Sequence, residues 1–252
     1  MAEKISGNLI LDDTSNPKYG LKKVAIKFKN LSTGGYHKGY KILLFLWDTG
    51  NFKIPIGFAL YYKGSKTINE LARKGLSLLR NTYEIRPKLV LADGAFFTEQ
   101  TAKVITDYGW ALVMRFNKAR LLSNTPIRKL IPRGYGETIG ELKNHTKLKT
   151  IRRKGRFYTC NRMLWDFKKI LKLYASRWKI EETFRVLKGC IGLNLCQQHS
   201  LESQKIYILM CLVLFACVEK EKKESIYKEL EKGYFEELDI KNILKQGLSP
   251  AC

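Results

Sequence analysis

The chain has 252 residues, of which 45% are hydrophobic and 12% aromatic, and its formal net charge is +23. This hydrophobic content can bury a core, so the composition excludes a chain that is disordered overall, and the length allows one large domain or two small ones. Self-repulsion from so large a positive charge is tolerated most easily beside a polyanion. Aromatic residues interleave with the basic ones, and the termini are not basic amphipathic helices, so we expect nucleic acid rather than a membrane as the partner.

The termini and the cysteines indicate a cytoplasmic protein. The N-terminal stretch MAEKISGNLI has no apolar segment of the kind that a secretory signal needs. The six cysteines form no Cys-x-x-Cys pair, so we expect reduced thiols that act as small core residues. The apolar run Ile206–Val218 is too short to span a bilayer and predicts a buried helix.

The first strands are predicted from short apolar runs. Asn8–Asp13 predicts a strand that ends on two carboxylates, followed by a Pro/Gly/Lys-rich connection through Gly35. Tyr40–Trp47 and Lys53–Tyr62 are apolar and β-rich. The turn residues Asp48-Thr49-Gly50-Asn51 separate these two runs, so they predict a hairpin.

The next segments alternate helix and strand. Thr67–Tyr83 carries helix formers and spaced leucines, and Lys88–Ala92 is a compact strand stopped by Asp93-Gly94. Thr98–Tyr108 predicts a short helix that its first threonine can cap, and Trp110–Arg115 predicts another strand. Three antiparallel strands followed by crossover units predict a mixed sheet with helices packed on its faces.

The second half of the chain changes composition. Residues 116–160 are polar, basic and rich in turn residues, so we interpret them as an insertion with one or two short strands around Lys149–Tyr158. Asp166–Lys188 predicts one long helix, and Ser203–Val218 predicts a second, apolar helix. Residues 219–252 are charged, with scattered apolar side chains, and predict a tail of one or two surface helices.

One face of the long helix carries an unusual set of polar residues. They are Tyr174, Arg177, Glu181 and Lys188, with Arg185 near the edge of the same stripe. At about 100° per residue, the first four fall within a sector of about 60°. A carboxylate, cations and a phenol side by side suit a metal ion next to a phosphodiester. Arg177 and Glu181 are equally an ordinary i,i+4 ion pair of a surface helix.

Acidic residues follow the predicted strands in a suggestive order. Asp12, or its neighbour Asp13, ends the first strand, Asp93 ends the fourth, and Glu181 lies on the late helix. In an open mixed sheet, strand ends collect at one edge, where sites form. Carboxylate oxygens are the ligands that Mg²⁺ accepts, and two such ions stabilise the attacking and leaving oxygens of an in-line phosphoryl displacement. The simpler interpretation is that these aspartates belong to ordinary turns.

Three segments carry a resemblance to a known family: LILDDT, LVLADGAFF and YASRWKIEETFRVLK. They resemble the catalytic domain of DDE transposases of bacterial insertion sequences, specifically the IS-four family, which a Tyr-Arg-Glu-Lys signature at this spacing defines. The resemblance covers roughly residues 8–218. It implies that residues 1–218 form a ribonuclease-H-like α/β domain, a mixed sheet flanked by helices, with the insertion (about 116–160) before the helix that bears the catalytic Glu. The charged tail of C-terminal helices would follow at 219–252.

The resemblance also implies roles for individual residues. Asp12, Asp93 and Glu181 would be the catalytic residues and would hold two Mg²⁺ (or Mn²⁺) ions. We choose Asp12 over Asp13 because the family often places Thr or Ser two residues after the first acid, as Thr14 is here; Asp13 remains the alternative. Four side chains from the stripe would bind DNA near the cleaved phosphate: Tyr174, Arg177, Lys188 and Arg185.

The implied function is metal-dependent cleavage and strand transfer at insertion-sequence ends. The partners would be transposon-end and target DNA, bound by a homodimer in the cytoplasm of a bacterium or archaeon, close to the nucleoid. Only about ten residues precede Asp12, so we expect the family's N-terminal DNA-recognition region to be missing from this chain. Two other interpretations keep the fold: a non-catalytic nucleic-acid-binding remnant, and a ribonuclease-H-like nuclease. Two tryptophans near the signature, Trp165 and Trp178, are expected to pack in the core.

Overall fold

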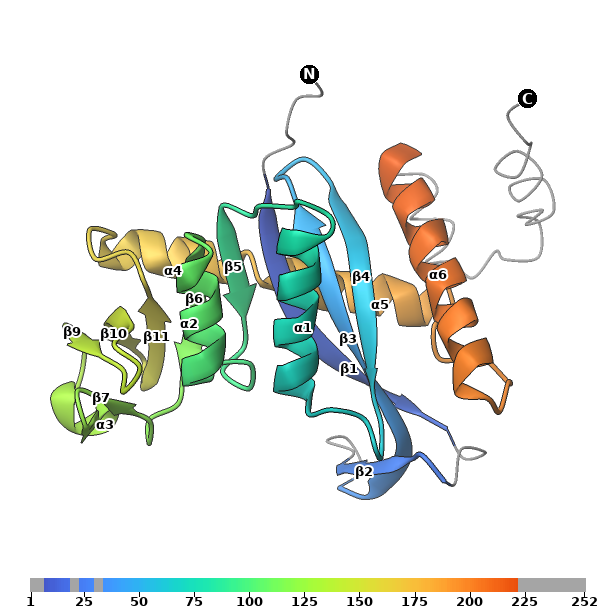
Figure 1. The fold of residues 1–252 in the computed structure, drawn as a ribbon, viewed down its shortest axis with the longest axis horizontal. Helices are drawn as coiled ribbons and strands as arrows, with labels where there is room; N and C mark the ends of the chain where they lie inside the picture. Colours follow the sequence, from blue (N-terminus) through green and yellow to red (C-terminus); the bar gives the residue numbers. More distant parts are fainter. Residues whose placement is uncertain (1–6, 19–22, 30–33, 222–252) are drawn as a thin grey trace.

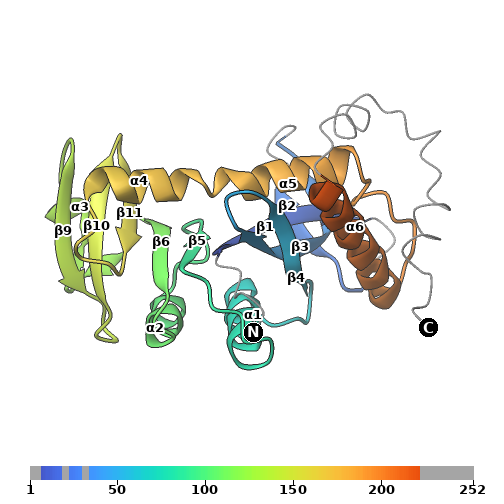
Figure 2. The ribbon, with the colours of Figure 1, turned by 90° about the horizontal axis from the view of Figure 1, so that it is seen from above.

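A nine-stranded mixed sheet forms the centre of the molecule, with helices on both of its faces (Figures 1 and 2). The computed structural model describes residues 7–18, 23–29 and 34–221. The strand order is β2-β3-β1-β5-β6-β11-β10-β9, and β4 also pairs with β3. The strands of this sheet are β1 (Asn8–Pro17), β2 (Ile26–Lys29), β3 (Tyr36–Asp48), β4 (Lys53–Tyr61), β5 (Leu89–Ala92), β6 (Ala111–Phe116), β9 (Gly136–Glu141), β10 (Lys147–Arg153) and β11 (Arg156–Cys160).

The helices divide between the two faces of the sheet. In Figure 2, α1 and α2 lie on one side, and α4 and α5 run in line across the other. Helix α6 packs against β4 and α5 beside this second face. The helices are α1 (Ile68–Asn81), α2 (Glu99–Asp107), α3 (Ile127–Leu130), α4 (Phe167–Ala175), α5 (Trp178–Gly189) and α6 (Leu201–Glu221).

Alternation along the buried strands supplies both hydrophobic layers. On β1, Leu9 and Leu11 pack with α1 and α2, whereas Ile10 packs with α4, α5 and α6. Successive strand side chains point to opposite faces of a sheet, so this central strand contributes to both layers. The mixed α/β architecture predicted from the sequence is therefore confirmed.

Several predicted elements are confirmed with small shifts at their ends. The predicted hairpin is the β3–β4 pair, and its turn residues contain the hydrogen bond from the Thr49 amide to the Phe52 carbonyl at 3.1 Å. Thr67 caps α1 in a capping box with Glu70, and the Thr98 hydroxyl accepts the Thr101 amide at the start of α2. These caps satisfy amides that the first turn of a helix leaves without partners.

Two predictions about strands are wrong. The first strand does not end on its carboxylates, because β1 continues to Pro17 along its antiparallel partner β3. The segment 116–160 holds more strand than the one or two short pieces expected: β9, β10 and β11 extend the main sheet from β6, and β7 (Leu121–Leu122) pairs with β8 (Thr125–Pro126) beside them. Leucines and phenylalanines of this segment join the same hydrophobic cluster as α1 and α2, which explains why it folds onto the sheet.

The predicted long helix over Asp166–Lys188 is interrupted. Helix α4 ends at Ala175 and α5 begins at Trp178, with Ser176 and Arg177 forming a tight turn between them. Four i→i+3 hydrogen bonds tighten this junction, donated by the amides of Ser176, Arg177, Lys179 and Ile180. The two helices stay roughly in line in Figure 2, so the chain crosses the sheet with a local change of pitch.

Helix α6 is longer and more exposed than predicted. It has 21 residues, so it extends beyond the predicted apolar run Ile206–Val218. By length and composition alone, Leu201–Glu219 could cross a membrane, unlike that shorter run. Only 33% of that stretch is buried. Ile208, Leu212 and Phe215 face the core, whereas Leu209 and Val213 are more than half exposed. Most of the predicted tail 219–252 lies outside the described residues.

Of the five described cysteines, those at positions 160, 190, 196 and 211 are buried, in agreement with their predicted place in the core, whereas Cys217 is exposed. Cys252 lies outside the described residues. The buried thiols therefore act as small apolar groups in the packing.

Gly75 of α1 provides a test of the packing between α1 and the sheet. A Cβ atom at this position would overlap the Phe45 ring of β3. Overpacking of this kind costs about 1–3 kcal/mol, and the better helix propensity of alanine returns only about 1 kcal/mol. We therefore expect Gly75→Ala to lower the free energy of unfolding by about 1 kcal/mol in urea denaturation. Gly189→Ala is the matched control, because its Cβ would meet no atom within 4 Å; a variant at Gly75 as stable as this control would contradict the packing.

Candidate active site

Two of the predicted acids lie next to each other because of strand register. β1 and β5 pair in parallel over four residues, and the last pair joins Leu11 to Ala92. Asp12 and Asp93 are the next residues on their strands, so both follow the point at which parallel pairing ends. Asp93 follows β5 directly, as predicted, whereas Asp12 remains within β1.

The alternation along β1 separates Asp12 from its neighbour. Asp12 shares the face of Ile10, toward α5, and it contacts Arg177 at the start of that helix. Asp13 lies on the opposite face, where Lys41 Nζ pairs with its Oδ2 at 2.8 Å. The structure thus brings Asp12, and not Asp13, to the side of the sheet that carries Glu181.

Arg177 joins the first and third acids. Its Nη1 donates to Asp12 Oδ2 at 2.6 Å, and its Nη2 donates to Glu181 Oε1. The side chains of Arg177 and Asp12 are only 16% and 19% exposed. The predicted i,i+4 pair therefore exists, but it faces β1 from the inner side of α5 and does not form a surface stripe.

Tyr174 joins the second acid to the same group. Its hydroxyl donates to Asp93 Oδ1 at 3.3 Å, and the guanidinium carbon of Arg177 lies 5.7 Å from its ring centroid. Tyr158 of β11 packs edge-on against the Tyr174 ring, with the centroids 4.8 Å apart. Burial raises the pKa of the Tyr174 phenol to about 12, so it is a neutral donor near pH 7.

The other signature cation, Lys188, and the neighbouring Arg185 lie further along α5. Lys188 Nζ donates to the Ser15 carbonyl of β1 at 2.9 Å, and burial lowers the pKa of this ammonium. Arg185 is exposed and lies over the ring of Trp178, 5.9 Å from its centroid. Trp178 is 52% exposed, so the prediction that it packs in the core is wrong, whereas Trp165 packs against the buried cluster as predicted.

Asp12 is the most strongly perturbed acid of the group. Burial raises its pKa from 3.8 to about 6, against the opposing effect of the Arg177 charge; Asp13 and Asp93 add to the rise. Desolvation disfavours the charged carboxylate, and one cation shared with Glu181 does not compensate fully. The site therefore holds more negative charge than its own cations neutralise.

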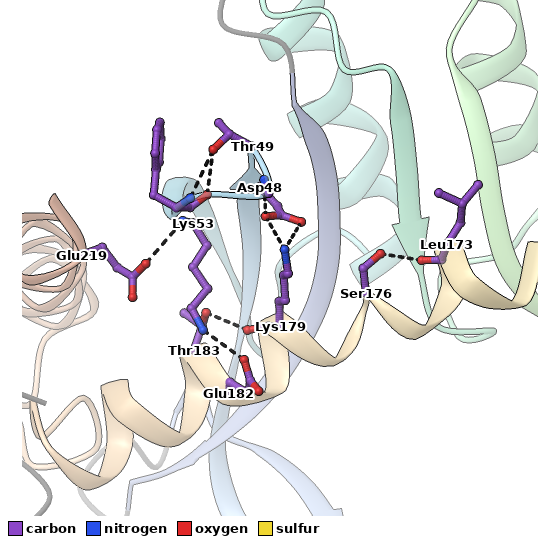
Figure 3. A network of polar contacts seen from close by, with 11 residues as sticks. Asp48, Thr49, Lys53, Leu173, Ser176, Lys179, Glu182, Thr183 and Glu219 are labelled. Atoms are coloured by element: carbon purple, nitrogen blue, oxygen red, sulfur yellow. Dashed lines mark hydrogen bonds and ion pairs between the residues drawn. The ribbon is translucent and has the colours of Figure 1, made fainter. Parts of the chain in front are cut away.

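A polar network that the sequence did not reveal holds α5 in this position (Figure 3). Lys179 Nζ donates to both oxygens of the buried Asp48 carboxylate at 2.8 Å, and Lys53 Nζ pairs with Glu182 at 3.1 Å. Figure 3 shows these contacts running from α5 to the β3–β4 turn. The sequence predicts Asp48 only as a turn residue, and its i,i+2 bond to the Gly50 amide confirms that role.

Residues 7–216 match the family described as "Transposase DDE domain". The chain belongs to this family. Among solved structures it is similar to the piggyBac transposase in a synaptic complex with hairpin DNA, with 12% identity and a TM-score of 0.52 over 81% of this chain and 45% of that chain. The DDE transposase domain thus spans less than half the length of that protein, and the likeness concerns the fold alone.

Weaker similarities extend to two nucleases. Endonuclease V of Ciona intestinalis shares 9% identity at a TM-score of 0.33, covering 72% of this chain and 86% of that one. The NurA nuclease of Sulfolobus solfataricus shares 9% identity at a TM-score of 0.34, covering 87% and 86%. A search of curated proteins finds no match. The ribonuclease-H-like fold expected for the DDE transposase domain agrees with its sheet order and with the piggyBac similarity.

The residues that could hold a metal ion are close but not assembled around one point. Among the described residues, no three Asp, Glu, His or Cys side chains form a group that could hold a metal ion. Asp12 and Glu181 are bound to Arg177, and Asp93 to Tyr174. The donor set nevertheless fits a divalent cation, because it offers hard oxygen atoms and a desolvated, incompletely compensated carboxylate.

Two open hollows flank this group, and the turn between β10 and β11 separates them. One is lined by Tyr174, Arg177 and Trp178 together with basic residues of the turn: Arg153, Lys154 and Arg156. The other is lined by Asp93 and by basic residues on the far side: Arg115, Lys118, Arg120 and Arg156. These basic residues were not predicted as site residues, and for all of them except Arg115 the available signal was the basic composition of 116–160.

Asp12 gives a pH-dependent test of the electrostatics. The pKa of Asp12 is raised in the folded state, so ionisation of its carboxyl group lowers the free energy of unfolding. This destabilisation is absent below about pH 4 and fully present above about pH 6. A shift from 3.8 to about 6 corresponds to about 3 kcal/mol. In EDTA, the unfolding free energy of Asp12→Asn minus that of wild type should therefore rise by about 3 kcal/mol between pH 4 and pH 7. Asp13→Asn is the control; an equal rise there would contradict the assignment.

Proposed function

We propose that the chain is the catalytic domain of an insertion-sequence transposase of the IS-four group. In this proposal it cleaves DNA at the ends of the element and transfers the freed strand to target DNA, using divalent metal ions. Membership of the DDE transposase family supports the reaction class. The Tyr-Arg-Glu-Lys spacing from Tyr174 to Lys188 supports the narrower group.

The observation that carries the proposal is the contact between residues far apart in sequence. Arg177 forms ion pairs with Asp12, 165 positions away in the sequence, and with Glu181. Asp93 is linked to this group through Tyr174. A structural ion pair needs one acid and one base. Here two acids share a single arginine and a third, Asp93, binds the neighbouring Tyr174, on one side of the sheet and beside a basic hollow. This arrangement is costly for stability and useful for phosphoryl transfer.

In the proposed reaction, Asp12, Asp93 and Glu181 would hold two Mg²⁺ or Mn²⁺ ions, and these would supply activation of water and stabilisation of charge on the attacking and leaving oxygens. Hydrolysis of a phosphodiester leaves a 3′-OH, and that hydroxyl then displaces the 3′ oxygen of a phosphodiester in the target strand. Tyr174, a neutral phenol, donates a hydrogen bond without adding charge. The protein therefore contributes mainly positioning and electrostatic stabilisation.

The cationic residues supply the DNA contacts in this proposal. Arg177, Lys188 and Arg185 would bind the backbone near the cleaved phosphate. The β10–β11 turn would support the strand on either side of it. Lysine and arginine on phosphates fix the register of DNA without reading its sequence. We also propose that the transposase acts in the cytoplasm as a homodimer, since two transposon ends must be cut and joined to the same target.

Cleavage of plasmid DNA tests the acids directly. We expect purified protein to nick supercoiled plasmid with Mg²⁺ or Mn²⁺, and Asp12→Asn, Asp93→Asn and Glu181→Gln each to reduce the rate by roughly 10³-fold, because each removes a charged metal ligand. Matched controls are Asp13→Asn and Glu182→Gln, which change neighbouring carboxylates paired with Lys41 and Lys53.

The outcomes separate the possible functions. Cleavage that survives in the three site variants, or is abolished equally in the controls, would refute the assigned site. Salt-sensitive DNA binding without cleavage under either metal would indicate a non-catalytic remnant. Nicking without joining of a 3′-OH oligonucleotide to the plasmid would indicate a nuclease.

The basic turn provides a second test. Replacing Lys154 and Arg156 with Gln should weaken DNA binding and reduce the magnitude of the salt slope, d log K/d log[salt], by about 1 for each phosphate that the turn no longer neutralises. Arg73→Gln with Lys74→Gln removes the same charge from α1, on the opposite face of the sheet. Filter binding at salt concentrations from about 50 to 200 mM compares the salt slopes of the two double variants. Equal slopes would show that the turn does not bind DNA.

A further inference from the structure

Arg177 lies between two of the three predicted metal ligands. Its guanidinium binds one oxygen of Asp12 and one of Glu181, from β1 and α5, and both of these acids are proposed metal ligands. A positive group shared between two carboxylates compensates charge in the same way as a bound cation. Within the described ranges, the side-chain contact of the third acid, Asp93, is with a neutral donor, the Tyr174 hydroxyl.

The other acids nearby already have their own cations. Asp13 pairs with Lys41, and Asp48 with Lys179, both at 2.8 Å. Arg177 is therefore the one cation that the described residues place on Asp12 and Glu181, and its single charge faces two negative charges. A divalent cation would balance them better, and it would repel the guanidinium at such short range.

The guanidinium of Arg177 has one donor that its two ion pairs leave unused. Within the described part of the chain, its buried Nε has no hydrogen-bond partner, although buried donors are nearly always satisfied. The same side chain lines the hollow that contains Arg153, Lys154 and Arg156. A rotation of the guanidinium toward this hollow would leave the carboxylates and bring it beside the proposed path of the DNA backbone.

We propose that Arg177 is a resident counter-ion, which leaves Asp12 and Glu181 when a divalent cation binds and then contacts a DNA phosphate. This inference rests on the proposed function and adds an order of events: cation binding releases the arginine that the DNA needs. Cation and DNA would then each strengthen binding of the other, because both favour the released position of Arg177.

Calorimetric titration of the full chain with Mn²⁺, without DNA, tests the exchange. Arg177→Gln removes the competing charge but keeps hydrogen-bonding atoms, so it should bind Mn²⁺ with an apparent Kd about tenfold lower than wild type. Arg177→Lys keeps a positive charge but lacks the planar guanidinium that bridges both carboxylates. Its apparent Kd for Mn²⁺ should therefore lie between those of wild type and Arg177→Gln. The control is Lys172→Gln, which removes an exposed charge from the last turn of α4 and should leave the Kd unchanged.

Thermal unfolding gives a second readout that does not depend on activity. Without metal, Arg177→Gln should melt below wild type, because the two acids lose their counter-ion; saturating Mn²⁺ should raise its Tm by more than it raises that of wild type. In wild type, Ca²⁺ should also tighten binding of a DNA duplex, and this enhancement should shrink in Arg177→Gln.

Mn²⁺ binding that is weaker or unchanged in both Arg177→Gln and Arg177→Lys would overturn the exchange. If wild type binds Mn²⁺ and nicks DNA in that case, only the inference fails and the proposed function stands. If wild type binds no Mn²⁺, the inference and the proposed metal-dependent function fail together.

Discussion

The placement of α5 across β1 is the constraint on which the candidate site depends. Ile180 and Leu187 are fully buried against the sheet, and burial of each contributes roughly 1.5–3 kcal/mol. This apolar side fixes which residues of the helix face outward and which lie along β1. Lys179 then secures the helix to Asp48, and Lys188 to the Ser15 carbonyl. Glu181 lies between these two points, so its position follows from the packing of the helix and from these two anchors.

Much of this arrangement could be predicted from the sequence because the signals were local. The β3–β4 hairpin has turn residues between two β-rich runs, and Asp93 follows a short apolar strand bounded by Gly94. Strand pairing could not be predicted in the same way. Residues 136–160 are polar and basic, yet β11 pairs with β6, and β10 and β9 extend the sheet from it. Long-range backbone hydrogen bonds and a few buried side chains such as Leu148 outweigh their composition.

The details of the site were less predictable for a physical reason. Asp12 and Asp13 are adjacent residues of the same type, so the sequence alone does not distinguish them. The alternation of side chains along β1, between two buried layers, places them on opposite faces of the sheet. A helical wheel assumes one uniform pitch, but the i→i+3 bonds at Ser176 and Arg177 change it between Tyr174 and Glu181. The apolar ring of Trp178 predicts a place in the core, but the residue lies on the outward side of α5, which leaves half of it exposed.

The outer edge of the sheet has a consequence of its own. Among the strands that the structure describes, β9 is the last in the order, and a free edge of this kind can recruit a strand from another molecule. Two glutamates, Glu137 and Glu141, alternate with the half-exposed Ile139 along it. Glu137 pairs with Lys149 of β10 at 3.0 Å, which keeps its charge beside the edge. Charges on an edge strand disfavour pairing between the edges of two copies, so these acids oppose aggregation through β9.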